Sequence, residues 1–209
     1  MSLNISASGS KDFEIHPAGV FAARCTRLID LGTQDSEYMG QKKRAKKVMI
    51  AFETTQLMTE GEFTGKPFLV SNRYTASLHE NSALRKSLKS WRGRDFTAVE
   101  LDRFDLKTIL GKPCMLNVVH NVEGEKTYAN IDSIMPLPAG MPPPKTGVTI
   151  HFDVDEPDME VFGKLSKGMQ ETISRSPEFQ SHQKGGTYAE DESASGSGPS
   201  FPDDSDIPF

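Results

Sequence analysis

The sequence predicts a mainly β fold, in which a five-stranded barrel carries a helical insertion between its third and fourth strands and is followed by a disordered acidic C-terminal tail. Two observations predict the barrel: five segments have strand patterning, and residues 81–110 change to helical spacing between the third and fourth of them. A third, the division of charge, predicts the tail. Residues 151–209 hold 13 acidic and 4 basic side chains, whereas residues 1–150 hold 16 acidic and 20 basic.

The first three strands are expected at residues 19–31, 47–56 and 67–77. The second shows period-two alternation most clearly, with Val48, Ile50 and Phe52 on one face and Met49, Ala51 and Glu53 on the other. The polar residues 33–41 are expected to form a turn, and the glycine-containing residues 58–66 a loop.

A helix is expected over residues 81–92, because Leu84, Leu88 and Trp91 recur at i, i+4 and i+7 and form one apolar stripe that places Trp91 in the core. Thr97 and Glu100 have capping-box spacing at the start of a second helix, residues 98–104. A further turn at 106–110, strands at 113–121 and 127–136, and a hairpin at 122–126 complete the order.

This order is that of an OB-fold, a small barrel that binds oligonucleotides on one face. Another five-stranded barrel or an α+β sandwich would fit the same order. Residues 1–13 are expected to be a flexible leader and residues 14–137 the barrel. Residues 138–176 contain a proline-rich break, a strand-like piece and a short amphipathic helix over 159–174, and residues 177–209 are expected to be a disordered linker and acidic tip.

Catalysis is not expected, because the sequence has no phosphate-binding loop, dinucleotide fingerprint or nucleophile elbow, and its five histidines are scattered. No cofactor and no metal are therefore expected. A nuclease using the acidic residues Asp153, Asp155, Glu156 and Asp158 remains an alternative, although a calcium loop would need a regular ligand spacing and a turn glycine. Cys25 and Cys114 are expected to be free core residues. No membrane segment is recognised, and a cytoplasmic location is expected.

Binding of single-stranded nucleic acid requires cations for the phosphates and aromatic rings for the bases. The candidate cations are Arg24, Lys42, Lys43, Arg44, Lys46, Lys47 and Arg73, and the candidate stacking residues are Phe52, Tyr74 and Tyr128. A solvated strand edge is the alternative for the lysine run, and core packing is the alternative for the aromatic residues.

The chain ends in an acidic run, an apolar Ile-Pro-Phe and a terminal carboxylate, which together suit a tethered peptide ligand better than a buried element. The residues concerned are Asp203, Asp204, Asp206, Ile207, Pro208 and Phe209. A frayed terminus is the alternative. The ending resembles the C-terminal tip of bacterial single-stranded DNA-binding proteins, which implies docking on replication and recombination partners.

Parts of the body resemble a bacteriophage and prophage group of single-stranded DNA-binding proteins. The most specific pieces are Trp91-Arg92-Gly93-Arg94 and Gly111-Lys112-Pro113-Cys114, within a resemblance that covers residues 17–137 and the last seven residues. It implies an OB-fold, sequence-tolerant binding of single-stranded DNA, and a role in phage replication or recombination in the bacterial host cell. A homo-oligomer is possible, but the longer helical insertion and the proline-rich break put the tetramer of the housekeeping protein in doubt. A recombination mediator, a strand-annealing protein and an OB-fold adaptor are the alternatives.

Overall fold

The computed structural model describes residues 14–38, 41–145 and 147–183. The expected leader and the six tip residues, Asp203, Asp204, Asp206, Ile207, Pro208 and Phe209, lie outside the described residues. The strands are β1 (Gly19–Tyr38), β2 (Gln41–Leu57), β3 (Pro67–Thr75), β4 (Pro113–Glu123), β5 (Lys126–Met135) and β6 (Ile150–Phe152). The helices are α1 (Ala83–Arg92), α2 (Ala98–Asp102), the 3-10 turn η1 (Leu106–Ile109), α3 (Met159–Lys164), α4 (Lys167–Ser174) and α5 (Pro177–Gln183).

The strands form one sheet in the order β3-β2-β1-β4-β5, antiparallel except for β6, which pairs in parallel with β1. The prediction of a mainly β fold with helices between the third and fourth strands is therefore confirmed. β1 is the central strand of this sheet. One edge pairs with β2 along nearly its whole length, and the other pairs first with β4 and then with β6. Register shifts at Cys25/Arg27 and Asp30/Gly32 interrupt the ladder with β2, and bulges of this kind bend and twist a long strand.

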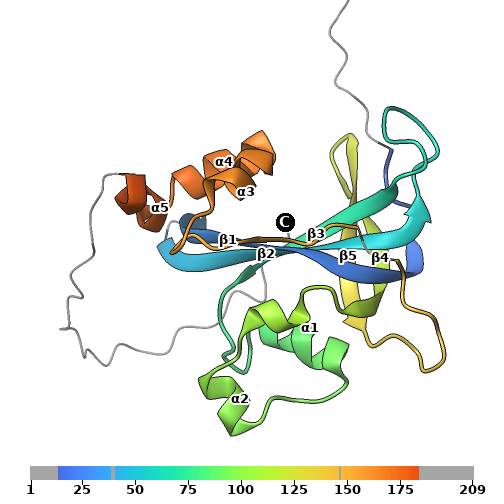
Figure 1. Cartoon of the computed structure of the whole chain (residues 1–209), viewed down its shortest axis with the longest axis horizontal. Coiled ribbons are helices and arrows are strands. Elements are labelled where there is room, and N and C mark those ends of the chain that lie inside the picture. The colour runs from blue at the N-terminus through green and yellow to red at the C-terminus, as the bar shows by residue number, and fades with distance from the viewer. Residues whose placement is uncertain (1–13, 39–40, 146, 184–209) are drawn as a thin grey trace, which may run out of the picture.

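Helices cover both faces of the sheet (Figure 1): α1 and α2 lie below it, and α3, α4 and α5 lie above it. The core on the α1 side contains the apolar stripe of that helix, and the Trp91 ring meets the Phe52 ring at 5.4 Å between centroids. The predicted core position of Trp91 is confirmed. Cys25 and Cys114 are buried and free in the same core, also as expected.

A second core lies on the opposite face, between the β1–β2 sheet and the segment 150–183, which we call the helical arm. Phe152, Leu165, Ile173 and Phe179 from the arm pack there against Ile29, Leu31, Met49 and Ala51. β2 is thus apolar on both faces because both faces are covered. A strand-like piece near residue 150 was expected, and β6 confirms it.

Two sequence predictions for the arm are wrong. Residues 159–174 form two helices, because Asp158 caps α3 and Ser166 caps α4, each side chain accepting backbone N–H groups. Residues 177–183 belong to a helix, α5, where a linker was expected. Phe179 is buried in the second core, and this tertiary contact stabilises a short polar helix that the sequence alone does not indicate.

The expected turn at residues 33–41 is also wrong, because β1 continues to Tyr38 and β2 begins at Gln41. The resulting β1–β2 hairpin extends past the core, so its side chains need no apolar face. Its ladder is supported by cross-strand charge, with Arg44 Nε lying 3.2 Å from Asp35 Oδ1. A polar ribbon of this kind lacks the apolar alternation by which a strand is recognised.

No helix in the described part of the chain is long and apolar enough to cross a bilayer.

Candidate nucleic-acid interface

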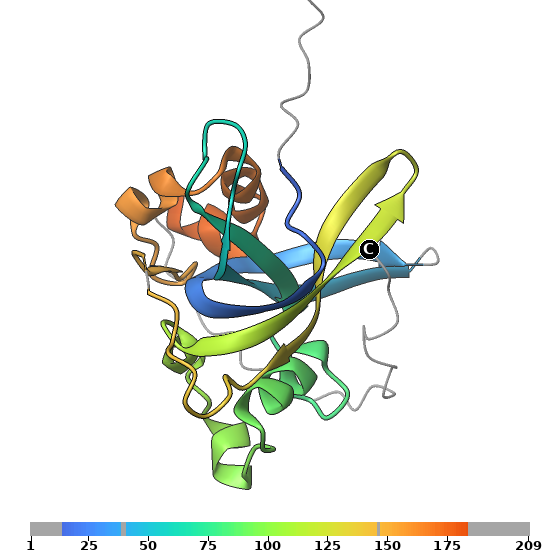
Figure 2. The same cartoon turned by 90° about the vertical axis from the view of Figure 1, so that its right-hand side faces the viewer.

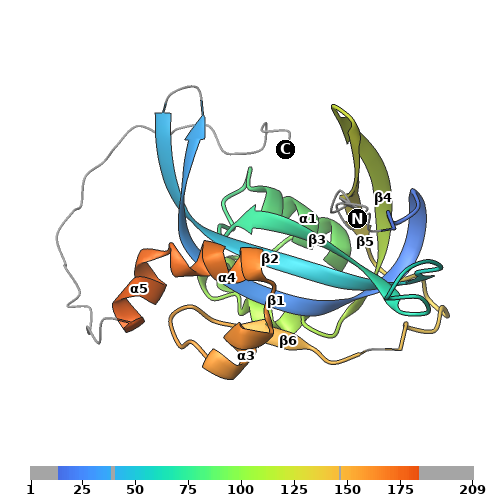
Figure 3. The same ribbon diagram turned by 90° about the horizontal axis from the view of Figure 1, so that it is seen from above.

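Two hairpins extend to the same side of the molecule, the β1–β2 hairpin and the β4–β5 hairpin (Figure 2). Figure 3 shows β3 between them, and α4 lying over β1 and β2. The edge of β3 approaches β5, since Asn72 Nδ2 donates to the Ile131 carbonyl at 3.3 Å. β3 and β5 therefore offer a stretch of sheet surface flanked by two hairpins.

The outward side chains of this surface follow from the alternation of each strand. In β3, Phe68, Val70 and Tyr74 are buried, whereas Leu69, Ser71 and Arg73 are exposed. In β5, Ile131 is buried and Tyr128 is 44% exposed. Lys47 continues the same face from β2, where its Nζ donates to Thr75 Oγ1 at 2.9 Å. We call Leu69, Ser71, Arg73, Tyr128 and Lys47 the outer β3–β5 face.

This face combines an aromatic ring with cations, which is the composition that single-stranded nucleic acid requires. Of the predicted site residues this face contains Lys47, Arg73 and Tyr128. Lys43 lies on the same side of β2 as Lys47, because side chains two or four residues apart in a strand share a face.

Two predicted stacking residues are corrected by the structure. Phe52 is fully buried against Trp91, and Tyr74 is only 5% exposed. Both belong to the apolar core next to α1, so neither ring can meet a base. Burial raises the pKa of the Tyr74 phenol, although hydrogen bonds to Ser87 and Asn72 oppose the shift.

Arg24 is a structural residue. Its Nη1 donates to the Gly111 carbonyl at 2.8 Å, and its Nε donates to the Pro144 carbonyl at 3.0 Å. The guanidinium thereby holds the loop before β4 and the proline-rich segment against β1. Two of its five N–H donors are thereby committed to backbone carbonyls.

The basic run of β2 is divided between its two faces. Arg44 pairs with Asp35, and Lys46 Nζ lies 2.7 Å from Asp155 and 3.1 Å from Asp30. Desolvation opposes the charge of Lys46, but its hydrogen bonds to the two aspartates raise its pKa overall. Lys46 is thus committed to ion pairs with Asp30 and Asp155. The side chain of Lys42 lies outside the described residues.

The same ion pairs bear on the acidic cluster. Oxygens of Asp30, Asp153 and Asp155 lie within 4.8 Å of one another. Asp30 and Asp153 also line a pocket of about 180 Å³, together with His151. The ammonium group of Lys46 compensates two of these carboxylates, those of Asp30 and Asp155. Asp158, grouped with them in the sequence, instead caps α3.

One aromatic residue was missed by the sequence interpretation. Phe63, in the loop between β2 and β3, is 37% exposed, and Lys66 Nζ lies 5.1 Å from its ring centroid. An aromatic ring between two glycines, Gly61 and Gly65, has no strand to turn it inward. The position of Phe63 between these two glycines was the sequence feature that could have indicated an exposed ring.

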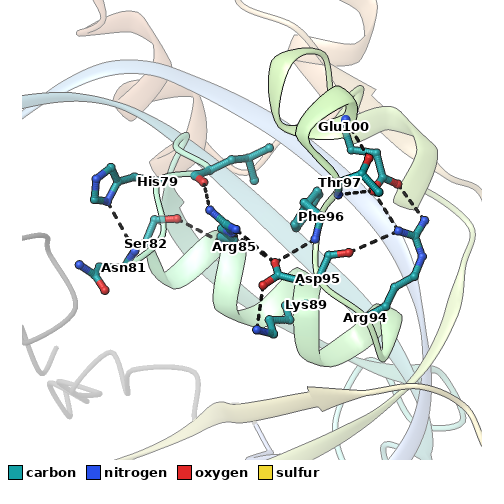
Figure 4. A network of polar contacts seen from close by, with 11 residues as sticks. His79, Asn81, Ser82, Arg85, Lys89, Arg94, Asp95, Phe96, Thr97 and Glu100 are labelled. Carbon is teal, nitrogen blue, oxygen red and sulfur yellow. Dashed lines mark hydrogen bonds and ion pairs between the residues drawn. The ribbon is translucent and has the colours of Figure 1, made fainter.

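Several basic residues of α1 and of the loop after it form ion pairs within the helical insertion (Figure 4). Lys89 Nζ lies 2.8 Å from Asp95, which also pairs with Arg85, and Arg94 forms two hydrogen bonds to Glu100. Glu100 also completes the capping box with Thr97, as the sequence predicted. This side of the molecule therefore offers less positive potential than its lysine and arginine content indicates.

The acid sensitivity of the insertion follows from these pairs. The hydrogen bond from Lys89 is the largest cause that lowers the pKa of Asp95, to about 2, and the bonds from Arg94 lower the pKa of Glu100. Since both carboxyl groups are more acidic in the folded than in the unfolded chain, their stabilising effect is present above the ordinary carboxylate pKa of about 4 and is lost as pH falls toward the folded pKa.

Glu100→Gln keeps the cap but removes the charge. We expect its melting temperature to lie below that of the parent at pH 7 and the gap to narrow below about pH 4. An equal gap at pH 7 and pH 3 would contradict this assignment.

No protein-family model matches the chain, and a search of the curated proteins gives no match.

Proposed function

We propose that the protein is a sequence-tolerant single-stranded DNA-binding protein built on an OB-fold barrel. The strand order β3-β2-β1-β4-β5, with a helix between β3 and β4, is compatible with this barrel. The bridge from Asn72 to Ile131 supports it further, because β3 and β5 are the two edges that such a barrel brings together.

The observation that carries the proposal is the outer β3–β5 face. Its β3 and β5 side chains are exposed, it is flanked by two hairpins, and its Arg73 and Tyr128 belong to the two strands that the Asn72–Ile131 hydrogen bond joins. A ring that stacks on any base, beside cations that neutralise phosphates, gives binding with little sequence preference. The role is non-catalytic and belongs to phage replication or recombination, in line with the resemblance of the sequence.

The tip residues Asp203–Phe209 are proposed to recruit a partner protein through their acidic side chains and C-terminal carboxylate. The tip and the DNA face are then two separate functions of one chain. Loss of the tip would leave the DNA contacts in place.

An oligo-dT titration at increasing salt tests the proposal. We expect tight binding at low salt, with log K falling by about 0.7 per tenfold rise in salt for each phosphate neutralised, and near-equal affinity for mixed sequences. The chain without residues 203–209 is expected to bind equally or more tightly, since three negative charges are removed from a chain that binds a polyanion. No binding at low salt would refute the DNA-binding role and leave an adaptor as the remaining reading. Loss of binding on truncation would refute the separation of the two functions.

A further inference from the structure

The helical arm contacts β1 where the β1–β2 hairpin begins to leave the core. The Thr33 backbone N–H donates to Glu178 Oε2 at 3.0 Å, and the Thr33 hydroxyl donates to Glu178 Oε1. These bonds join positions 145 residues apart. Burial alone would raise the pKa of Glu178, but the hydrogen bonds from Thr33 lower it overall, so the carboxylate is ionised at neutral pH. Hydrogen bonds to an ionised acceptor are stronger than neutral ones.

The residues on either side of Thr33 are also held by the arm. Gln34 Nε2 donates to the Thr172 carbonyl at 3.1 Å. Gly32 has a φ of +69°, and a Cβ placed on it would lie 2.5 Å from Ser176 Cβ. Only glycine allows this backbone conformation and this close approach at once. Three consecutive residues of β1 are therefore fixed by α4 and the start of α5.

These residues lie directly opposite the basic run. Gly32, Thr33 and Gln34 pair with Lys47, Lys46 and Ala45 of β2. Beyond them the hairpin is a two-stranded ribbon, which has little stability of its own in water. Figure 3 shows α4 beside the point where this ribbon leaves the sheet. The arm is therefore placed to determine the direction in which the ribbon extends.

We infer that Glu178 is a positioning residue that fixes the β1–β2 hairpin and thereby holds Lys43 beside the outer β3–β5 face. The effect on DNA rests on the proposed function, whereas the fixing of the hairpin does not. Glu178 acts through Thr33 and does not touch the nucleic acid.

Limited trypsin digestion of the full chain tests the fixing of the hairpin. In Glu178→Ala, cleavage after Lys43 and Arg44 is expected to become about tenfold faster, because the ribbon loses a charge-assisted anchor and opens more often. Cleavage after Lys126, in the other hairpin, serves as the internal control and is expected to stay unchanged. Glu178→Gln keeps an acceptor and a donor facing Thr33 and is expected to restore most of the protection.

Oligo-dT binding by Glu178→Ala tests whether the fixed hairpin contributes to DNA affinity. The direction of the change in affinity separates loss of positioning from the simple loss of a negative charge. Removing a negative charge by itself strengthens binding to a polyanion. Loss of positioning instead weakens it, by about three- to tenfold, and lowers the salt slope by about 0.7 for each cation withdrawn. Glu160→Ala is the matched control: it removes the same charge from the same arm, and among the described residues the ion pair of Glu160 is with Lys164, at 2.6 Å and on the exposed surface. Its binding is expected to be unchanged or slightly tighter.

Each combination of the trypsin and DNA-binding results supports one conclusion. Unchanged cleavage in Glu178→Ala overturns the inference whatever the DNA result. Faster cleavage with unchanged or tighter DNA binding overturns the positioning role while the proposed function stands. If the parent chain fails to bind oligo-dT, the proposed function fails, and the trypsin result alone decides whether Glu178 fixes the hairpin.

Discussion

Replacing Tyr128 by alanine is expected to weaken oligo-dT binding by roughly tenfold or more. Loss of one aromatic stacking platform costs about 1–3 kcal/mol per base. Tyr128 is the candidate because its ring is 44% exposed on β5, the strand that a hydrogen bond from Asn72 to the Ile131 carbonyl joins to β3. The measurement is the dissociation constant for labelled oligo-dT at low salt. Tyr128→Phe keeps the ring and is expected to bind like the parent.

Tyr74→Phe is the matched control on a buried tyrosine. It removes a hydroxyl that accepts a hydrogen bond from Asn72 at 3.3 Å, deep in the core. We expect it to leave DNA binding unchanged. If Tyr128→Ala binds as tightly as the parent while remaining folded, the outer β3–β5 face is not the binding surface.

Replacing Phe52 by alanine is expected to lower the free energy of unfolding by about 3–5 kcal/mol, the usual cost of removing a buried phenylalanine ring. Phe52 is fully buried, and its ring meets Trp91, whose indole N–H donates to the Pro113 carbonyl at 2.9 Å. The cavity would lie between the sheet and α1. Urea denaturation measures the change, and DNA affinity per folded molecule is expected to be unaffected.

Phe63→Ala provides the comparison for this second prediction. Phe63 is exposed in the β2–β3 loop, and surface substitutions of this kind change stability by about 0.5 kcal/mol or less. Equal destabilisation by the two substitutions would contradict the placement of Phe52 in the core. Weaker DNA binding by folded Phe52→Ala would indicate that the core interpretation is incomplete.

The sheet and the first helix could be predicted because their apolar side chains repeat with a fixed period. Leu84, Leu88 and Trp91 form one helix face, and β2 alternates two apolar faces. The extension of β1 to Tyr38 could not be predicted in this way, because a two-stranded ribbon in solvent has no periodic pattern of apolar side chains. α5 was missed for a related reason: one buried residue, Phe179, stabilises it through contacts distant in sequence.

The candidate site was predicted in part. The alternate positions that hold apolar residues show which face of a strand is buried. Tyr74 shares the phase of Phe68 and Val70, so its burial could have been predicted. Tyr128 lies between Thr127 and Ala129, which leaves its ring outside. The role of Arg24 could not be predicted, because its two carbonyl acceptors are 87 and 120 residues away.

β1 is synthesised early, yet its last partners are synthesised late. Thr33 cannot form its hydrogen bonds until Glu178, 145 residues further along the chain, has been synthesised. At ordinary translation rates the interval between the synthesis of the two residues is on the order of 10 s. During that interval Ile29 and Leu31 have no arm to cover them. Contacts between such distant positions also slow folding itself. The nascent chain therefore passes through a stage in which one face of its central strand is apolar and open, when it is most exposed to aggregation and most in need of a chaperone.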